Sequence, residues 1–375
     1  MTRLVYIVDS LAIFGGIERV TIDKLNWLAK EPEYEVVLLT VNQGKHPVVF
    51  QLDPRVVRFD LNILFHRKYQ FSGLRRIAYN IFLHNRFRRK MSDLLYTLSP
   101  HVIICTRIFF VQDVVKVSNK IPVVFEAHNS CLYEFEGDSI FRRLNSFFWY
   151  RSVRKTRMVV TLTRGDAEEW YKYNRNVRVI PNVVNLNNTN TYSNCSSKSV
   201  IFVGRYSYQK DIMTLLKIWR LVHKRYPEWV LNIFGGYGEQ QEEFLNEIGV
   251  NDLNIVLHNP KQSIFEEYIR NSILLLTSRY EPFGLVIPEA MSCGLPIVAF
   301  DCPYGPADII TNEVDGYLIK NRDIDDYVNK VCSLIENEKL RIYMGKAGIS
   351  SSQRFRECII MPQWKKVFEE LLTVN

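Results

Sequence analysis

The sequence predicts an α/β protein built from two doubly wound parallel sheets, one in each of two domains. Its 375 residues exceed what one hydrophobic core usually supports, so two domains are expected. Strand-like apolar runs alternate with helical patterns from end to end, which indicates parallel sheets covered by helices. A segment rich in Asn, Ser and Thr, residues 186–199, separates the two halves.

The N-terminal half, residues 1–185, contains six candidate strands. They are 4–10, 35–41, 102–106, 123–128, 158–163 and 177–181. Runs that are apolar throughout are typical of strands covered on both faces. The first run reaches Asp9 where a secretion signal would stay apolar, so we interpret it as a buried strand.

The C-terminal half repeats this organisation in residues 200–355. Its candidate strands are 200–204, 230–234, 255–258, 273–277, 297–300 and 317–319. Residues 186–199 offer little apolar surface to bury, so we expect a linker and hinge there. Residues 356–375 form an amphipathic pattern, which predicts a closing helix that packs back toward the N-terminal domain.

Composition excludes several classes of protein. No stretch approaches the roughly 20 uninterrupted apolar residues of a membrane span. The seven cysteines form an odd number without a C-x-x-C pair, so we expect a reduced, cytoplasmic protein without a disulfide framework or a cysteine metal site.

Positive charge is concentrated in the N-terminal half. Residues 1–185 hold 28 Lys and Arg against 17 Asp and Glu, whereas the remainder holds 20 against 23, so the halves carry +11 and −3. Residues 67–90 contain eight cations and no acidic residue, with Ile77, Ile81, Phe82 and Leu83 among them. This pattern favours a basic amphipathic helix on an anionic membrane.

A second basic and aromatic stretch runs from Arg142 to Arg157. For both stretches, solvated helix faces are the ordinary alternative, and nucleic acid is the other electrostatic one.

The most informative stretch is residues 281–289, which contains Glu281, Gly284 and Glu289. It follows the apolar run 273–277, so Glu281 lies near the carboxyl end of a buried parallel strand, where open α/β sheets bind ligands. Gly284 permits close backbone approach, and residues 284–286 present N–H groups at a helix start. The alternative is a pair of surface carboxylates favoured by the helix dipole, which suits Glu289 better than Glu281.

Two other strand-to-helix turns are suited to an anion. Arg205 and Lys210 flank the loop after the run 200–204, and both can converge on one phosphate-sized group. Gly15 and Gly16 follow the first strand and open a helix whose free N–H groups favour an anion. Two solvated cations and a plain tight turn are the ordinary alternatives.

His128 ends the run 123–128, again at the carboxyl end of a candidate strand. A single histidine at such a place is either structural or part of a ligand site, and its position at the sheet edge keeps the second possibility open.

Together these segments resemble the family-four retaining glycosyltransferases, which have the two-domain GT-B fold. The spacing from Glu281 to Glu289 resembles the E-x7-E motif of that family. The supporting segments are Gly15 to Arg19, Ile180 to Asn185, Gly204-Arg205 with Lys210, and Gly235 to Gly238. Phe300 to Ile310 is similar to a subset of bacterial surface-polysaccharide enzymes that use UDP-sugars. The resemblance implies two Rossmann-like domains that face each other across a cleft.

The resemblance also implies roles for individual residues. Arg205 and Lys210 would neutralise the donor diphosphate, Glu281 would bond hydroxyls of the donor sugar, and Glu289 would hold the ribose. Backbone amides of Phe283, Gly284, Leu285 and Val286 would touch sugar and phosphate.

In the N-terminal domain, the resemblance places Gly15 and Gly16 at the diphosphate and His128 at the reacting sugar. Fixed cations and helix-start amides can stabilise a leaving diphosphate without a metal, and no clear D-x-D metal site is present.

The resemblance therefore implies a metal-independent, retaining glycosyltransferase without a cofactor. It would move a hexose or N-acetylhexosamine from a nucleotide sugar, UDP-linked by expectation, to a lipid-linked or polysaccharide acceptor. The site would be cytoplasmic, on the inner face of the membrane.

Three alternatives remain open at this point. One is a sucrose-type or phosphorolytic transferase on the same fold, which would leave the basic N-terminal half unexplained. Another is a nucleotide-sugar-binding or nucleic-acid-binding protein without transferase activity, although nucleic acid is the less favoured partner. An NAD-dependent oxidoreductase fits least, because the G-x-G-x-x-G fingerprint is absent.

Overall fold

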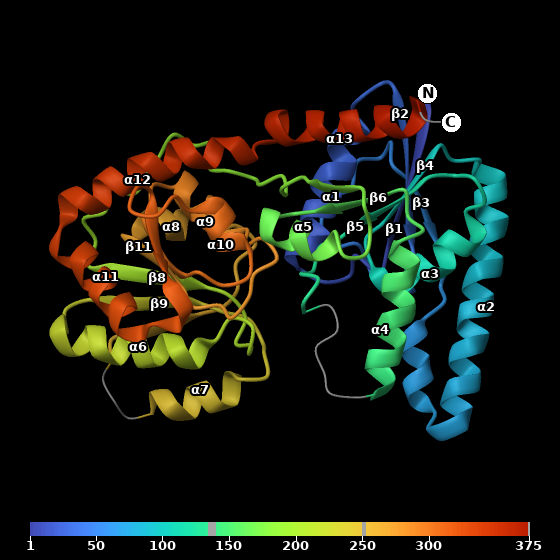
Figure 1. Ribbon diagram of the computed structural model, residues 1–375. Coiled ribbons are helices and arrows are strands. Elements are labelled where there is room, and N and C mark those ends of the chain that lie inside the picture. The colour runs from blue at the N-terminus through green and yellow to red at the C-terminus, as the bar shows by residue number, and fades with distance from the viewer. Residues whose placement is uncertain (134–139, 250–252, 374–375) are drawn as a thin grey trace. The chain divides into compact units, whose positions relative to one another are not determined.

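The computed structural model describes residues 1–133, 140–249 and 253–373, without the side chains of residues 140–146 and 321 (Figure 1). The chain divides into two compact units. The first unit joins Met1–Val183 to Glu357–Asn375, and the second is Val184–Arg356.

The first unit is built on a seven-stranded sheet with the order β3-β2-β1-β4-β5-β6-β7, in which every paired neighbour is parallel. The strands are β1 (Thr2–Val8), β2 (Tyr34–Thr40), β3 (Val57–Asp60), β4 (Val102–Cys105), β5 (Val123–Glu126), β6 (Met158–Thr161) and β7 (Val177–Val179). Strand order reverses between β1 and β4, so the loops that leave these two strands diverge at the carboxyl edge.

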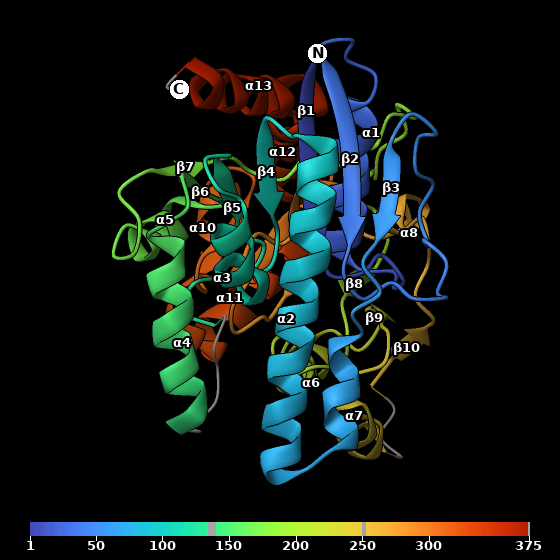
Figure 2. The ribbon, with the colours of Figure 1, turned by 90° about the vertical axis from the view of Figure 1, so that its right-hand side faces the viewer.

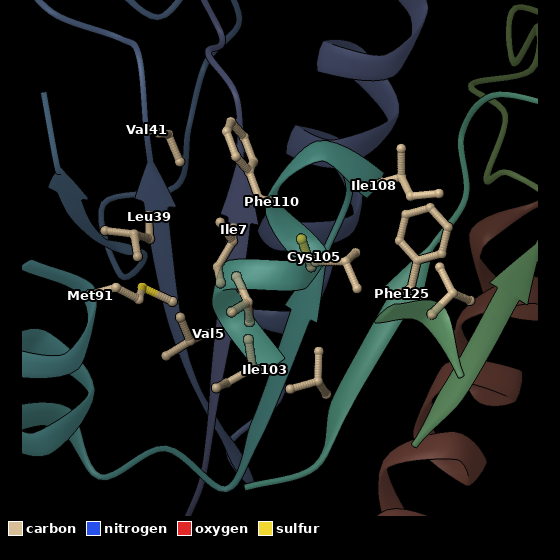
Figure 3. Close-up of a cluster of buried hydrophobic side chains, with 14 of the residues drawn as sticks. Val5, Ile7, Leu39, Val41, Met91, Ile103, Cys105, Ile108, Phe110 and Phe125 are labelled. Atoms are coloured by element: carbon tan, nitrogen blue, oxygen red, sulfur yellow. The ribbon is translucent and has the colours of Figure 1, made fainter. Parts of the chain in front are cut away.

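Helices cover both faces of this sheet. They are α1 (Gly16–Leu28), α2 (Gly73–Leu98), α3 (Ile108–Val117), α4 (Ile140–Val153), α5 (Arg164–Trp170) and α13 (Glu357–Thr373), with the 3-10 helix η1 (Phe65–Gln70) before α2. On one face α2 and α3 pack on strand residues such as Val5 and Ile103 (Figure 3). On the other face α1 and α13 pack on residues such as Tyr6 and Val124.

The closing helix α13 supplies much of the second core. Trp364, Val367 and Phe368 are buried in the same cluster as residues of β1, β2 and α1. The ring of Phe368 meets the ring of Tyr34 edge to face, with centroids 5.6 Å apart. The last segment of the sequence therefore completes the first unit.

The first three turns of α2 extend beyond the sheet (Figure 2). The first buried residue of this helix is Leu83, eleven positions into it, and Leu74, Ile77, Ile81 and Phe82 are exposed. Leu83 was expected among the exposed apolar residues of a membrane-facing helix, and that assignment is wrong because Leu83 packs in the core with Phe87 and Met91.

The second unit has a six-stranded parallel sheet with the order β10-β9-β8-β11-β12-β13. Its strands are β8 (Ser199–Val203), β9 (Val230–Phe234), β10 (Ile255–His258), β11 (Ile273–Leu276), β12 (Ile297–Phe300) and β13 (Gly316–Ile319). The order reverses between β8 and β11, which places a topological switch point there.

Helices also cover both faces of the second sheet. They are α6 (Ile212–Arg225), α7 (Gln241–Ile248), α8 (Phe265–Arg270), α9 (Val286–Ser292), α10 (Gly305–Ile309), α11 (Ile324–Glu336) and α12 (Glu338–Ser352), with 3-10 helices η2 (Lys320–Arg322) and η3 (Gln353–Phe355). Residues of α6 and α11 share one core with Phe202, Leu275 and Phe300 of the sheet.

The twelve strands expected from apolar runs are all present, with ends that differ by a few residues. The strand that the sequence missed is β3, whose four residues are all exposed. An edge strand that buries nothing has no apolar pattern to reveal it, and β3 is defined only by its parallel pairing with β2.

The hinge expected over residues 186–199 needs a correction, because this segment lies inside the second unit. Leu186 and Cys195 are buried, and the Ser193 amide donates to the Cys293 carbonyl over 2.8 Å. The polar side chains form local turns, as where Asn187 Oδ1 accepts from the Thr189 amide. The chain passes between the units at Val183–Val184 and Arg356–Glu357.

Within the described residues, no helix has the length and apolar character needed to cross a membrane.

Replacing Phe368 with Ala should destabilise the first unit by roughly 3–5 kcal/mol, because it leaves a cavity in the core beneath α13. Urea unfolding followed by tryptophan fluorescence would measure the loss. The control is Ile359→Ala on the same helix, where the side chain is 51% exposed. Equal effects of the two substitutions would show that α13 does not belong to the core.

Candidate functional site

The residues expected to bind an anion and a sugar lie in the loops that follow β8 and β11, the two strands at the switch point of the second sheet. Arg205 and Lys210 lie in the loop between β8 and α6, and Glu281 lies in the loop between β11 and α9. Because β8 and β11 are paired neighbours, their carboxyl ends bring these two loops together.

An ion pair joins the two loops directly. Lys210 Nζ contacts Glu281 Oε1, and the Ser278 hydroxyl donates to the same oxygen over 2.7 Å. Glu281 is only 3% exposed, which contradicts the alternative of a surface carboxylate. The structure therefore pairs the cation expected at the diphosphate with the carboxylate expected at the sugar.

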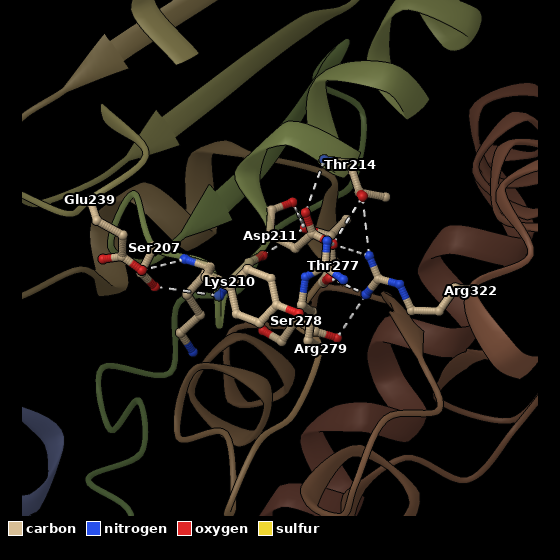
Figure 4. Close-up of polar contacts among 10 residues, drawn as sticks. Ser207, Lys210, Asp211, Thr214, Glu239, Thr277, Ser278, Arg279 and Arg322 are labelled. Atoms are coloured by element: carbon tan, nitrogen blue, oxygen red, sulfur yellow. Dashed lines mark hydrogen bonds and ion pairs between the residues drawn. The ribbon is translucent and has the colours of Figure 1, made fainter. Parts of the chain in front are cut away.

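A second charged cluster, around Asp211, also joins the two loops. Asp211 caps the N-terminus of α6 in a left-handed conformation, and its buried side chain accepts from the Thr214 amide. Arg279 Nη2 lies 3.0 Å from Asp211 Oδ2, and Arg322 contacts the same oxygen (Figure 4). Arg322 Nη1 also donates to the Thr277 carbonyl over 2.9 Å.

Further hydrogen bonds tie the backbones of the two loops. Thr277 Oγ1 donates to the Lys210 carbonyl over 3.0 Å, and the Arg279 amide donates to the Gln209 carbonyl over 2.8 Å. The Gln209 side-chain amide reaches the Tyr280 carbonyl over 3.2 Å. Lys210 and Glu281 are thus held by their backbones as well as by their own contact.

The loop after β12 packs on the backbone of Glu281. The Glu281 amide donates to the Pro303 carbonyl over 2.7 Å, and the amides of Tyr304 and Gly305 donate back to the Glu281 carbonyl. A Cβ on Gly305 would lie 1.9 Å from the Phe283 carbonyl oxygen, so a side chain there would force the loops apart. This contact explains why the motif from Phe300 to Ile310 needs its glycine.

The segment Phe283 to Glu289 turns into α9 at Gly284, whose φ of +93° favours glycine. The Phe283 ring is buried against Phe355, so only its backbone can serve a ligand. Leu285 precedes the first helical residue, Val286. The amides at a helix start lack intrahelical acceptors, as expected for this segment.

Glu289 lies in α9 and is 7% exposed, so the surface alternative is wrong here as well. The hydroxyl of Tyr268, from α8, lies 3.5 Å from Glu289 Oε2. Glu289 is therefore anchored in the second unit close to the helix start.

Arg205 is exposed at the end of β8, unlike the partly buried Lys210. The neighbouring Tyr206 fills the space beside the glycine segment 235–238, where a Cβ on Gly238 would lie 1.9 Å from the Tyr206 carbonyl oxygen. Glu239 Oε1 accepts from the Tyr208 amide over 2.7 Å, which lowers the pKa of Glu239 with help from the charge of Arg205. These glycines allow close packing of two loops.

In the first unit, Gly15 precedes α1 and Gly16 is its first residue. The carboxylate of Glu18 lies 2.2 Å from the position that a Cβ on Gly15 would take. A carboxylate of the first turn thus lies at the helix start where the sequence predicted a ligand anion.

His128 follows β5 and is 6% exposed. Its Nε2 lies 3.3 Å from Glu126 Oε1, and Glu126 in turn contacts Lys24 of α1. Burial is the main cause that lowers the pKa of His128 to about 4; the charges of Lys24 and Arg107 act in the same direction, and Glu126 opposes them. His128 is therefore a neutral imidazole near pH 7.

Two family models match the chain. Residues 14–188 match the model described as Glycosyltransferase Family 4, and residues 190–351 match Glycosyl transferases group 1. The chain belongs to the group 1 and family 4 glycosyltransferases. The resemblance deduced from the motifs and the expected fold class are both confirmed.

Similar proteins span the full length of this glycosyltransferase. An uncharacterized glycosyltransferase of Haemophilus influenzae is 28% identical over 376 residues, which cover 98% of this chain and 100% of that protein. The amylovoran biosynthesis glycosyltransferase AmsD of Erwinia amylovora is 27% identical over 379 residues, covering 98% and 99%. A variant of S. aureus TarM, solved with UDP, Fondaparinux and α-GlcNAc-glycerol, shares the fold with a TM-score of 0.79 at 16% identity, covering 98% and 100%.

Sequence reasoning missed several polar residues of this glycosyltransferase. Asp211 could have been found as an acidic N-cap directly before the apolar run of α6. Ser278 and Arg322 gave no comparable signal, because their importance comes from contacts across the fold. Lys24 and Glu126, which form a buried ion pair, were missed as well, because they lie 102 positions apart in the sequence.

Among the described residues of this glycosyltransferase, no group of three or more His, Cys, Asp or Glu side chains is arranged to hold a metal ion. The side chains of Arg142 and Arg143, part of the second basic stretch, lie outside the described residues.

The lowered pKa of His128 predicts a pH-dependent stability. Between about pH 4 and 6.5 the unfolded chain binds a proton that folded His128 does not, so the free energy of unfolding falls as pH falls. Relative to a His128→Gln variant, the wild type should lose roughly 1–2 kcal/mol between pH 6.5 and 5. Urea unfolding at each pH would measure this difference.

His66→Gln is the matched control, because His66 is exposed in the same unit. A wild-type minus His128→Gln difference that stays constant over this pH range would contradict the burial of a neutral His128.

Proposed function

We propose that this glycosyltransferase moves a hexose or N-acetylhexosamine from a UDP-sugar, with retention, to a lipid-linked or polysaccharide acceptor in the synthesis of a cell-surface glycan. Capsule, O-antigen and exopolysaccharide are glycans of this type. The observation that carries the proposal is the Lys210–Glu281 pair beside Arg205 at the switch point of the second sheet.

The charges at this switch point suit the two parts of a nucleotide sugar. Glu281 is an acceptor for sugar hydroxyls, whereas Lys210 and Arg205 are donors for a diphosphate. Lys210 contacts Glu281, so a bound diphosphate competes with Glu281 for that cation. Donor binding and the release of Glu281 toward the sugar are then one event.

The proposed reaction breaks the bond between the anomeric carbon and the phosphate oxygen and forms one to the acceptor oxygen. The acceptor proton passes to the leaving phosphate, and UDP departs. Charge grows on the diphosphate as that bond breaks, and fixed cations aimed at it lower the barrier. Arg205 and Lys210 supply this charge stabilisation, so we propose that no metal is required.

Other residues position the donor in this proposal. Glu289 holds the ribose, and the amides of Gly284, Leu285 and Val286 approach sugar and phosphate. Gly16 and His128 belong to the first unit, and the roles carried over for them are a diphosphate contact and a contact to the reacting sugar. The full-length similarity to AmsD supports a surface glycan as product, and UDP in the TarM complex supports the choice of donor.

Replacing Arg205 with Ala should lower kcat by roughly 100-fold or more while leaving folding intact, because the side chain is exposed and stabilises the leaving group. Mass spectrometry of UDP-sugar turnover on lipid-linked acceptors would measure this, with EDTA present to test metal independence. Lys217→Ala, at an exposed position on α6, is the control.

Glu281→Gln should also remove most transfer. The substitution removes the negative charge that accepts hydrogen bonds from the donor sugar, while it keeps the hydrogen bond from Ser278. Near-normal transfer by both variants would contradict the assigned site. Transfer to fructose phosphate or inorganic phosphate in place of lipid-linked acceptors would favour the sucrose-type or phosphorolytic alternative.

We propose further that the first unit rests on an anionic membrane through the projecting end of α2 with η1. Exposed apolar residues lie here beside cations, and the set is Arg67, Tyr69, Phe71, Leu74, Arg75, Arg76, Ile77, Ile81 and Phe82. Farther along α2, Arg88 lies 3.6 Å from Asp113 and Lys90 donates to the Leu61 carbonyl over 2.6 Å. Arg88 and Lys90 thus make contacts within the protein, so the projecting end of α2 is the better candidate for the membrane contact. The protein would then be peripheral on the cytoplasmic face of the membrane.

Replacing Arg75 and Arg76 together with Gln should weaken binding to vesicles containing anionic lipid by roughly 30-fold, at about 1 kcal/mol per cation. Vesicle sedimentation at fixed ionic strength measures the change. A Lys45→Gln, Arg175→Gln variant removes the same charge from exposed positions elsewhere in the unit. Equal partitioning of the two variants would make α2 an ordinary solvated helix, and tight salt-dependent RNA binding would favour the nucleic-acid alternative.

A further inference from the structure

A buried polar cluster lies beneath α1 and α13 on the first sheet. Glu126 ends β5 and His128 follows two residues later, on the same side as the core residue Val124. Lys24 comes from the buried side of α1. The three side chains meet within an otherwise apolar core that also contains Tyr6 and Trp364.

The ion pair in this cluster is almost fully removed from water. Lys24 is 3% exposed and Glu126 is 2% exposed. Lys24 Nζ lies 3.9 Å from the centre of the Trp364 ring of α13, so the C-terminal helix covers the pair. Desolvation of two charges can cost more than their attraction returns, so a buried pair is weak support for stability. The ion pair lies beside His128, which suggests that it serves His128 rather than stability.

Glu126 Oε1 is shared between Lys24 and His128. The oxygen contacts Lys24 Nζ and lies 3.3 Å from His128 Nε2, which is buried from solvent. Within the described residues, His128 Nε2 makes no hydrogen bond, so its interaction with the Glu126 carboxylate is chiefly electrostatic. Of the two ring nitrogens, Nε2 therefore faces a carboxylate.

A neutral imidazole carries its proton on one nitrogen and a lone pair on the other. A carboxylate beside Nε2 favours the proton there and disfavours the lone pair, which leaves Nδ1 as the acceptor. Lys24 matters because its ion pair holds the Glu126 carboxylate in place beside the ring. The other charged group that acts on His128 is Arg107.

We propose that Glu126, held by its ion pair with Lys24, is a positioning residue that holds His128 in the Nε2-protonated tautomer and leaves Nδ1 as a hydrogen-bond acceptor for a sugar hydroxyl. The ligand class rests on the proposed transferase function. The tautomer itself depends only on the first unit.

The direct test is nitrogen NMR of the full-length protein labelled with 15N-histidine at pH 7.5. The His128 signals are assigned by their loss in His128→Gln. We expect Nε2 to appear protonated and Nδ1 unprotonated. A Nδ1-protonated or doubly protonated ring in the wild type would overturn the proposal.

The matched variant is Lys24→Met with Glu126→Met, which replaces the ion pair with apolar side chains of similar length, a change that buried pairs often tolerate. Loss of the carboxylate should produce a mixture of tautomers. If the double variant folds and keeps the wild-type tautomer, Glu126 does not set it. Should the double variant fail to fold, the tautomer of the wild-type protein remains the measurement that decides the proposal.

Activity separates this inference from the transferase proposal. With lipid-linked acceptors and UDP-sugars, the double variant should lower kcat roughly 10- to 100-fold, as orienting partners of metal-bound histidines do, with a smaller change in KM for the donor. Lys365→Met removes a surface pair with Glu31 and Glu33 in the same unit and should leave kcat unchanged. The expected tautomer without any transfer would contradict only the proposed function, whereas a changed tautomer with unchanged kcat would overturn the positioning role.

Discussion

The Lys210–Glu281 ion pair joins the two loops that leave β8 and β11, and the rest of the candidate site is arranged around it. Glu281 is buried, so its charge is screened less than a surface charge and needs a partner. Lys210 supplies that partner. A donor that brings its own negative charge for Lys210 and hydroxyls for Glu281 can replace the pair without leaving either group unsatisfied.

This arrangement needs loops that keep their shape when the pair opens. Asp211 provides that stability, because Arg279 and Arg322 both contact its buried carboxylate and Thr277 bonds the backbone beside it. The close approach of Gly305 to Phe283 adds a third loop. Positioning by neighbouring contacts is what a site for charge stabilisation requires, since donors that must reorganise during the reaction lose much of their effect.

In the first unit, too, an ion pair is held by neighbouring contacts, and this pair is more deeply buried. The C-terminal helix α13 of this unit covers a core and a charged pair at once, because Trp364 packs with the apolar side chains and also faces Lys24. The segment that ends the chain is therefore coupled to the residues beside His128. A sequence pattern of apolar residues in α13 predicted a helix, but the cation beneath Trp364 has no signature in that pattern.

The sequence by itself determined the α/β class, twelve of the strands, the GT-B resemblance and the loops that carry Arg205, Lys210 and Glu281. Those features depend on local apolar runs and on motifs at strand ends, which a linear pattern records. Tertiary structure alone decided that Lys210 pairs with Glu281, that Arg322 reaches Asp211 from 111 residues away, and that β3 and residues 186–199 belong to folded units. Each of these features depends on contacts between segments that are far apart in the sequence. Such contacts form, and are removed from water, only when the chain has folded.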